Sequence, residues 1–128
     1  MVIVLKKGDD VLPKLREWLE RNRINSGFFY GIGGFQKAEI AFFDMAKKKF
    51  LKKKLPGPFE VLSMTGSVSQ GEKGIVIHTH VALADKGFKV IGGHLMAATV
   101  KATLELKLTQ TEILERVHDD ETGLDLLK

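Results

Sequence analysis

The sequence has 128 residues, a length typical of one folded domain, so we expect a single domain over residues 1–128. It contains 20 Lys and Arg against 16 Asp and Glu, a net charge of +4, and 44% of its residues are hydrophobic. Six clustered lysines account for the excess, because the rest of the chain has 14 basic against 16 acidic residues. This composition excludes a disordered chain and a uniformly basic nucleic-acid binder. The absence of cysteine excludes disulfides, thiolate nucleophiles, iron–sulfur clusters and zinc fingers.

The hydropathy pattern predicts no membrane association. No stretch approaches the roughly 18 consecutive apolar residues of a membrane span. The initial segment MVIVLKKGDD places its apolar residues before its charges, which is the reverse of a secretory signal. We therefore expect a cytoplasmic protein.

The N-terminal part predicts a strand followed by a helix. The apolar run Met1–Leu5 is typical of a short buried strand. Asp9 and Asp10 then provide a helix N-cap, and Pro13 falls in the first turn, where its missing N–H group is tolerated. Apolar residues recur at helical spacing, namely Val11, Leu12, Leu15, Trp18 and Leu19. This pattern predicts one long amphipathic helix over about residues 10–23.

The rest of the chain predicts strands. A glycine-punctuated aromatic segment from Gly27 to Gly34 indicates a bent or bulged strand and is followed by strand-like Ala38–Asp44. Four further strands are expected at Lys47–Leu55, Phe59–Ser69, Gly74–Ala84 and about Leu95–Thr109. Their hairpin-length connections favour a mainly antiparallel sheet with one covering helix, an α/β fold of the α+β type. One helix cannot shield both faces of this sheet, so the remaining apolar surface favours self-association.

Three of the four histidines lie in one short window. His78 and His80 occupy positions i and i+2 of a predicted strand and therefore share a face, roughly 6.5–7 Å apart. His94 follows Gly92-Gly93, where the backbone can approach a neighbour closely, and strand phase assigns it to the apolar side with Met96, Ala98 and Val100. A hairpin from Gly74 to Thr109 would bring the three side chains together. His118, beside Asp119 and Asp120, is predicted to be solvent-exposed.

The histidine window has two interpretations. Three neutral imidazoles and a water molecule are the ligand set of an open zinc site. The same residues could instead be strand histidines whose nitrogens are satisfied by backbone or hydroxyl partners. Spacing alone leaves both interpretations open.

A row of hydroxyls occupies one side of the strand Phe59–Ser69, formed by Ser63, Thr65, Ser67 and Ser69. Such a row could line a polar pocket or a subunit interface, or it could be a hydrated sheet face. No serine lies in a GxSxG setting, so the sequence gives little support to a serine hydrolase.

The segment KKKFLKKK contains the six clustered lysines, which are Lys47, Lys48, Lys49, Lys52, Lys53 and Lys54. One interpretation is a patch that binds phosphates, with Phe50 available to stack on a base. The other is an exposed edge strand whose lysines prevent strand-to-strand aggregation, and the sequence favours it. Any DNA binding by this segment should be weak, non-specific and steeply dependent on salt.

Three segments together resemble a known family. The strings FEVLSMTGSV at 59–68, HTHVALAD at 78–85 and GGHL at 92–95, in this order and spacing, are similar to the plants-and-prokaryotes conserved (PPC) domain. The resemblance covers nearly the whole chain and implies a homotrimer built on an antiparallel sheet. In plants the domain is joined to AT-hook segments in nuclear DNA-associated proteins, and no such hook occurs here. Stand-alone prokaryotic members carry the name "putative DNA-binding protein".

The resemblance places the family's histidine cluster on His78, His80 and His94. We therefore expect an oligomeric binding module, DNA-associated or regulatory, with a three-histidine site near the subunit boundary for a metal such as zinc or for a small anionic ligand. The alternative is a zinc-dependent hydrolase or lyase that uses the same three histidines, with Glu60 or Asp85 as the candidate general base. The sequence favours binding over catalysis.

Overall fold

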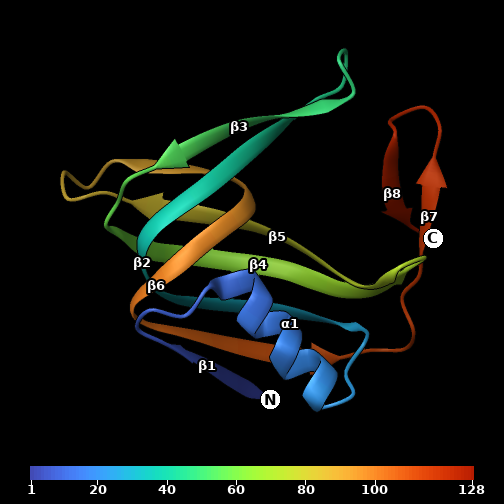
Figure 1. Cartoon of the computed structure of the whole chain (residues 1–128), viewed down its shortest axis with the longest axis horizontal. Helices are drawn as coiled ribbons and strands as arrows, with labels where there is room; N and C mark the ends of the chain where they lie inside the picture. The colour runs from blue at the N-terminus through green and yellow to red at the C-terminus, as the bar shows by residue number, and fades with distance from the viewer.

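The computed structural model describes residues 1–128 and contains one helix and eight strands (Figure 1). In chain order these are β1 (Val2–Lys6), α1 (Val11–Arg21), β2 (Gly27–Asp44), β3 (Lys49–Leu55), β4 (Phe59–Gly71), β5 (Gly74–Ala84), β6 (Val90–Gln110), β7 (Arg116–Asp119) and β8 (Leu124–Leu127). The strands predicted from the sequence are all present. β5 has the bounds expected for it, and the short C-terminal hairpin β7–β8 was not expected.

Six strands form one antiparallel sheet in the order β1-β6-β5-β4-β2-β3, which confirms the mainly antiparallel prediction. β6 also pairs with β2, so the pairings β6–β5, β5–β4, β4–β2 and β2–β6 form a closed ring. The ring closes because β2 and β6 are long and use different segments for different partners: Val90–His94 of β6 pairs with β5, and later residues pair with β2 and β1. The sheet is therefore a small barrel whose interior side chains form the core.

The core is one cluster of 23 buried hydrophobic residues, to which α1 contributes Val11, Leu15 and Leu19. α1 lies across the sheet beside β1 (Figure 1). The helix has 11 residues, so the prediction of a long helix over 10–23 was wrong. It ends because Arg23 adopts a left-handed φ of 57°, and the amides of Arg23 and Ile24 return to the carbonyls of Glu20 and Leu19. This Schellman turn directs Ile24 into the core. The helix is also too short to span a membrane, and the structure contains no other.

Glycines allow β2 and β6 to approach each other where the barrel closes. A Cβ atom on Gly33 would lie 2.2 Å from the carbonyl oxygen of Thr103, a backbone atom that cannot move aside cheaply. A Cβ atom on the adjacent Gly34 would meet the flexible end of Lys101 at 3.3 Å, and the carbonyl oxygen of Phe59 at 3.4 Å, which is an ordinary contact distance. The two neighbouring glycines therefore have different constraints.

We predict that Gly33→Ala lowers the free energy of unfolding by about 2 kcal/mol, since the added methyl group forces the two strands apart. Gly34→Ala is the matched control and should change stability by less than about 0.5 kcal/mol. Urea denaturation of the two variants and the wild type measures both values. Equal stability of the two variants would show that the β2–β6 contact does not constrain the barrel.

Candidate metal centre

The three histidines predicted as a cluster do converge. His78 and His80 project from the same face of β5, and His80 lies directly opposite His94 in the pairing of β5 with β6. One ring nitrogen from each residue lies within 4.8 Å of the other two. The Nε2 atoms of His78 and His80 are 3.3 Å apart, and the three ring centroids are separated by 5.0, 5.1 and 5.4 Å.

His94 reaches this cluster by a different route from the one predicted. Strand phase had assigned it to the apolar side, but Leu95 faces the core and His94 faces outward beside His80. The reason is a β-bulge: Ile40 pairs with Leu95 and Glu39 pairs with Ala97, so Met96 is an extra residue. The bulge reverses the alternation of β6, and the even-numbered core positions begin only at Ala98.

Gly92 brings the two histidine strands close together. A Cβ atom at this position would lie 2.4 Å from the carbonyl oxygen of Val81 on β5. The close backbone approach that the sequence predicted for this glycine pair is therefore confirmed. Gly92 holds β6 against β5 two residues before His94, and Gly93 lies against the carbonyl oxygen of Ala41 on β2.

The spacing of the nitrogens fits a metal ion. A tetrahedral Zn²⁺ ion with Zn–N bonds of about 2.0–2.1 Å holds two ligand nitrogens about 3.3–3.4 Å apart. The distance between the Nε2 atoms of His78 and His80 matches this value. A proton shared between these two rings would explain that single distance, but it would not explain the third ring. The His78, His80 and His94 group is thus one that could hold a metal ion.

The protonation states suit metal binding. Burial lowers the pKa of His94 to about 4, with smaller contributions from the charges of His78 and His80. The pKa of His78 is also lowered, first by burial and then by the nearby charges of Arg116 and His80. His78 and His94 are therefore neutral at pH 7, which is the form that coordinates metals.

Phe50 supports the cluster from β3. Its ring lies 4.8 Å from the ring of His94 and 5.0 Å from that of Phe43, centroid to centroid. Phe50 is half-buried in these contacts. Phe50 therefore packs against the histidine site, and its stacking on a nucleic-acid base stays a prediction.

Arg116 lies at the opposite side of the cluster and was not identified from the sequence. Its guanidinium group donates hydrogen bonds to Ser69 Oγ at 2.7 Å, Ser67 Oγ at 3.2 Å and the carbonyl oxygen of Asp125 at 3.0 Å. Ser67 and Ser69 are buried as a result. The other half of the hydroxyl row, Ser63 and Thr65, is exposed, with its two hydroxyls 3.1 Å apart. The hydroxyl row is therefore partly an anchor for Arg116 and partly a hydrated face.

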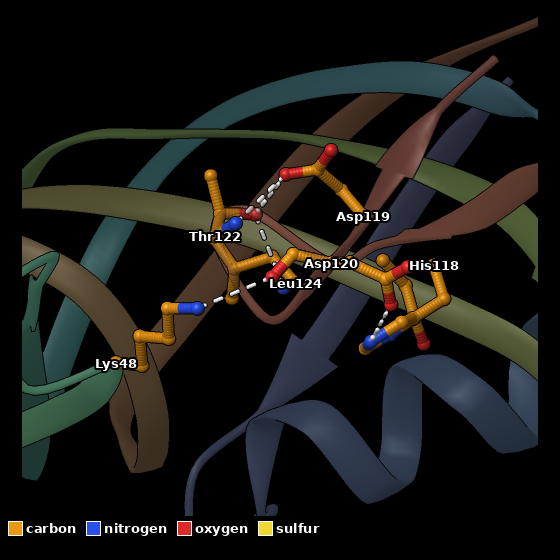
Figure 2. Close-up of polar contacts among 7 residues, drawn as sticks. Lys48, His118, Asp119, Asp120, Thr122 and Leu124 are labelled. Atoms are coloured by element: carbon orange, nitrogen blue, oxygen red, sulfur yellow. Dashed lines mark hydrogen bonds and ion pairs between the residues drawn. The ribbon is translucent and has the colours of Figure 1, made fainter.

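The tips of two hairpins meet, as Figure 2 shows. Lys48, in the turn between β2 and β3, donates from Nζ to the carbonyl oxygen of Asp120, in the turn between β7 and β8. Asp119 stabilises the second turn by accepting hydrogen bonds from the backbone and hydroxyl of Thr122. His118 is exposed, as predicted, and its Nδ1 lies 3.0 Å from the Asp125 carboxylate. It takes no part in the three-histidine cluster.

The carboxylates considered as general bases have other partners. Glu60 pairs with Lys101 at 3.4 Å. Asp85 accepts hydrogen bonds from the backbone of Gly87 and Lys89 and so stabilises the turn before β6. No carboxylate oxygen belongs to the ligand group formed by the histidines. The geometry does not favour the zinc-dependent hydrolase or lyase.

The six lysines lie along an edge. Lys47 and Lys48 are in the β2–β3 turn, and the other four are on β3, an edge strand of the sheet. All six are exposed, which fits the protected-edge interpretation. Weak, salt-dependent DNA binding by this segment stays a prediction of the sequence.

A cleft of about 940 Å³ lies away from the histidines. It is bounded by the start of α1, the second half of β2, the end of β3 and the bulged part of β6. None of its lining residues is a histidine, and it mixes apolar with singly placed charged side chains. The side chains that converge as a possible ligand set are those of the histidine cluster, and they lie outside this cleft.

The lowered histidine pKa values predict how the metal-free protein responds to pH. In the unfolded chain His94 has its ordinary pKa of 6.5, whereas the folded value is about 4. Between these values the unfolded chain binds a proton that the folded protein does not, so stability falls as the pH falls from about 6.5 to 4. In the presence of EDTA, His94→Gln should therefore lose less stability between pH 7 and pH 5 than the wild type. Urea denaturation at the two pH values measures this loss, and an equal loss in His94→Gln and the wild type would contradict the assignment.

Comparison with known proteins identifies a family and similar solved structures. The model of the Plants and Prokaryotes Conserved (PCC) domain matches residues 1–112, whereas no curated protein matches the chain. The metal-containing protein AF0104 from Archaeoglobus fulgidus is similar, with 36% identity, a TM-score of 0.91, and 100% of this chain and 91% of that chain covered.

Two further solved structures share the fold. A "putative DNA-binding protein" from Ralstonia eutropha JMP134 is 33% identical, with a TM-score of 0.91 and coverage of 99% of this chain and 89% of that chain. A plant- and prokaryote-conserved (PPC) protein from Pyrococcus horikoshii is 26% identical, with a TM-score of 0.89 and coverage of 100% and 90%. The family match, together with the antiparallel barrel and its single helix, confirms the resemblance seen in the sequence: the chain belongs to the Plants and Prokaryotes Conserved domain family.

Proposed function

We propose that the protein is a zinc-binding module in which His78, His80 and His94 are the metal ligands. One observation carries the proposal: three ring nitrogens from two strands lie within 4.8 Å of one another, two of them at the spacing that a tetrahedral ion requires. The pKa values of His78 and His94 are lowered, so these two ligands are neutral at physiological pH. The metal content named for the Archaeoglobus fulgidus relative supports the same site.

The ligand set favours zinc over magnesium and calcium. Three imidazoles with no thiolate and no carboxylate suit Zn²⁺, whereas Mg²⁺ and Ca²⁺ require oxygen ligands. Three protein ligands leave a fourth position for water or an anion. Because no carboxylate adjoins the cluster to act as a general base, binding is the better supported role than hydrolysis. A DNA-associated or regulatory role for the module has its support in the name of the Ralstonia relative.

We predict that untagged protein binds one Zn²⁺ ion per chain and that His80→Ala weakens this binding by more than about 100-fold, since even outer-shell partners of a metal contribute 10–100-fold. His118→Ala is the matched control and should bind zinc as the wild type does, because His118 lies outside the cluster. Competition with a chromophoric chelator measures the affinities. Zinc at 100 times its dissociation constant should also stabilise the wild type by about 2.7 kcal/mol.

A wild-type protein that contains no zinc, and that zinc does not stabilise, would disprove this function. Equal zinc affinity in His80→Ala and His118→Ala would also disprove it, because the ion would then be held elsewhere.

We further propose that the module works as a homotrimer. Support comes from apolar side chains on the outer face of the barrel: Phe28, Tyr30 and Ile32 alternate along β2 and are exposed, as are Val2 and Val4 on β1. These residues form a band of two apolar rows, one on each side of the exposed Lys107 and Glu105 of β6, because Tyr30 and Val2 both pair with Lys107, and Ile32 and Val4 both pair with Glu105. Exposed apolar bands of this kind mark protein interfaces.

This band borders the histidine site. Tyr30 pairs with Thr65, and Thr65 pairs with His80, so the three side chains lie in one row across the sheet. A second copy seated on the band would place the metal site near the subunit boundary.

Light scattering should therefore report three times the 14.2 kDa of one chain for the wild type. Ile32→Glu should shift the protein toward monomer by placing a charge in the apolar band. Phe88→Glu changes an even more exposed apolar residue outside the band and should remain trimeric. A wild-type particle of 14.2 kDa at micromolar concentration would refute the trimer.

A further inference from the structure

We propose that Arg116 makes the histidine centre a receptor for a small anion, which Arg116 and the bound metal hold between them. The ligand class is a molecule that presents carboxylate or phosphate oxygens. This inference rests on the proposed metal binding by His78, His80 and His94, and it adds the residue that selects the ligand.

The guanidinium group of Arg116 is fixed in place. It donates three hydrogen bonds, two to the hydroxyls of Ser69 and Ser67 on β4 and one to the carbonyl oxygen of Asp125 on β8. A guanidinium group has five N–H donors, so two remain available. One is on each terminal nitrogen, and a planar guanidinium suits the oxygens of a carboxylate or a phosphate.

Arg116 is adjacent to the metal ligands. Ser67, which accepts a hydrogen bond from the guanidinium at 3.2 Å, is the direct cross-strand partner of His78. Directly paired residues on one face of an antiparallel sheet have Cβ atoms about 4.5–5.5 Å apart. The free edge of the guanidinium is therefore within the reach of a small ligand that is bound to a metal at the histidines.

No acidic side chain neutralises this arginine. No carboxylate oxygen lies within 4.0 Å of the guanidinium. Asp125 offers Arg116 its carbonyl oxygen and directs its carboxylate to His118, 3.0 Å away, so its charge acts on Arg116 without forming an ion pair. The ligand group at the histidines likewise contains no carboxylate. A divalent ion beside an unpaired arginine makes the site strongly positive, so an anion is the favoured ligand.

Arg116 lies on β7, outside the residues that the family model matches. The family model ends at residue 112, and β7 begins at Arg116. The hairpin β7–β8 is held to the barrel by the amide of Gln70, which donates to the carbonyl oxygen of Leu114, and by Lys48 at the hairpin tip. The arginine is thus an addition by the C-terminal hairpin to a site whose histidines come from the barrel.

Cobalt-substituted protein tests the proposal, because the visible spectrum of Co²⁺ reports an anion that enters its coordination sphere. The wild type is titrated with inorganic phosphate in one series and with malonate in another. The anion that binds with the higher affinity shows whether the site prefers phosphate or carboxylate oxygens. Arg116→Gln should weaken the better anion at least tenfold while changing Co²⁺ affinity less than threefold. Arg21→Gln, on the exposed face of α1, is the control and should behave as the wild type.

Arg116→Lys separates loss of the charge from loss of the hairpin. It keeps a cation but offers a point charge in place of a planar fork, so it should recover part of the anion affinity. Hydrogen exchange over residues 116–127 checks that the hairpin stays docked in both variants.

The outcomes distinguish the two proposals. Wild-type anion affinity in both Arg116 variants, with Co²⁺ bound, would overturn the role of Arg116 and leave the metal site intact. A wild-type spectrum that neither anion changes would overturn the receptor proposal in the same way. Failure of the wild type to bind Co²⁺ or Zn²⁺ would overturn the metal site, and the receptor with it.

Discussion

The register between β5 and the first segment of β6 is the constraint on which the histidine centre depends. His80 and His94 face each other only in this register, and a slip of one residue would turn one imidazole to the opposite side of the sheet. Gly92 holds the strands close where a side chain would collide with the carbonyl oxygen of Val81. His78 lies two residues before His80 on β5, with the two Nε2 atoms 3.3 Å apart, so its position depends on the period of that strand, and the register adds His94 to the pair.

β6 serves two requirements that a regular strand could not meet together. Its first segment must direct His94 outward and Leu95 inward, and its later segment must bury Ala98 and Val100. With regular alternation along the whole strand, either Ala98 and Val100 would be exposed or His94 would point into the core. The extra residue Met96 resolves the conflict by reversing the alternation between the two segments. The bulge therefore lets one strand close the barrel with β2 and complete the histidine cluster with β5.

Local patterns predicted the barrel strands and the histidines, while long-range register decided the rest. Alternation gave the bounds of β5 and the shared face of His78 and His80, because both depend only on the period of a strand. The phase of His94 was wrong because a bulge leaves no clear mark in a sequence. The helix ended early because Arg23 adopts a left-handed conformation that its residue type does not signal. Arg116 was missed because its place beside His78 depends on how a short, polar hairpin docks on β4.

The barrel interior is filled with apolar side chains, so chemistry can take place only on its outer face, where additional elements must shape a site. Two hairpins do this from opposite sides. The β2–β3 hairpin supplies Phe50, which packs on His94, and the β7–β8 hairpin supplies Arg116 beside His78. Lys48 and Asp120 join the two hairpin tips. Because rigid strands fix the metal ligands and separate hairpins supply their surroundings, the hairpins can alter which anion binds without disturbing the metal ligands.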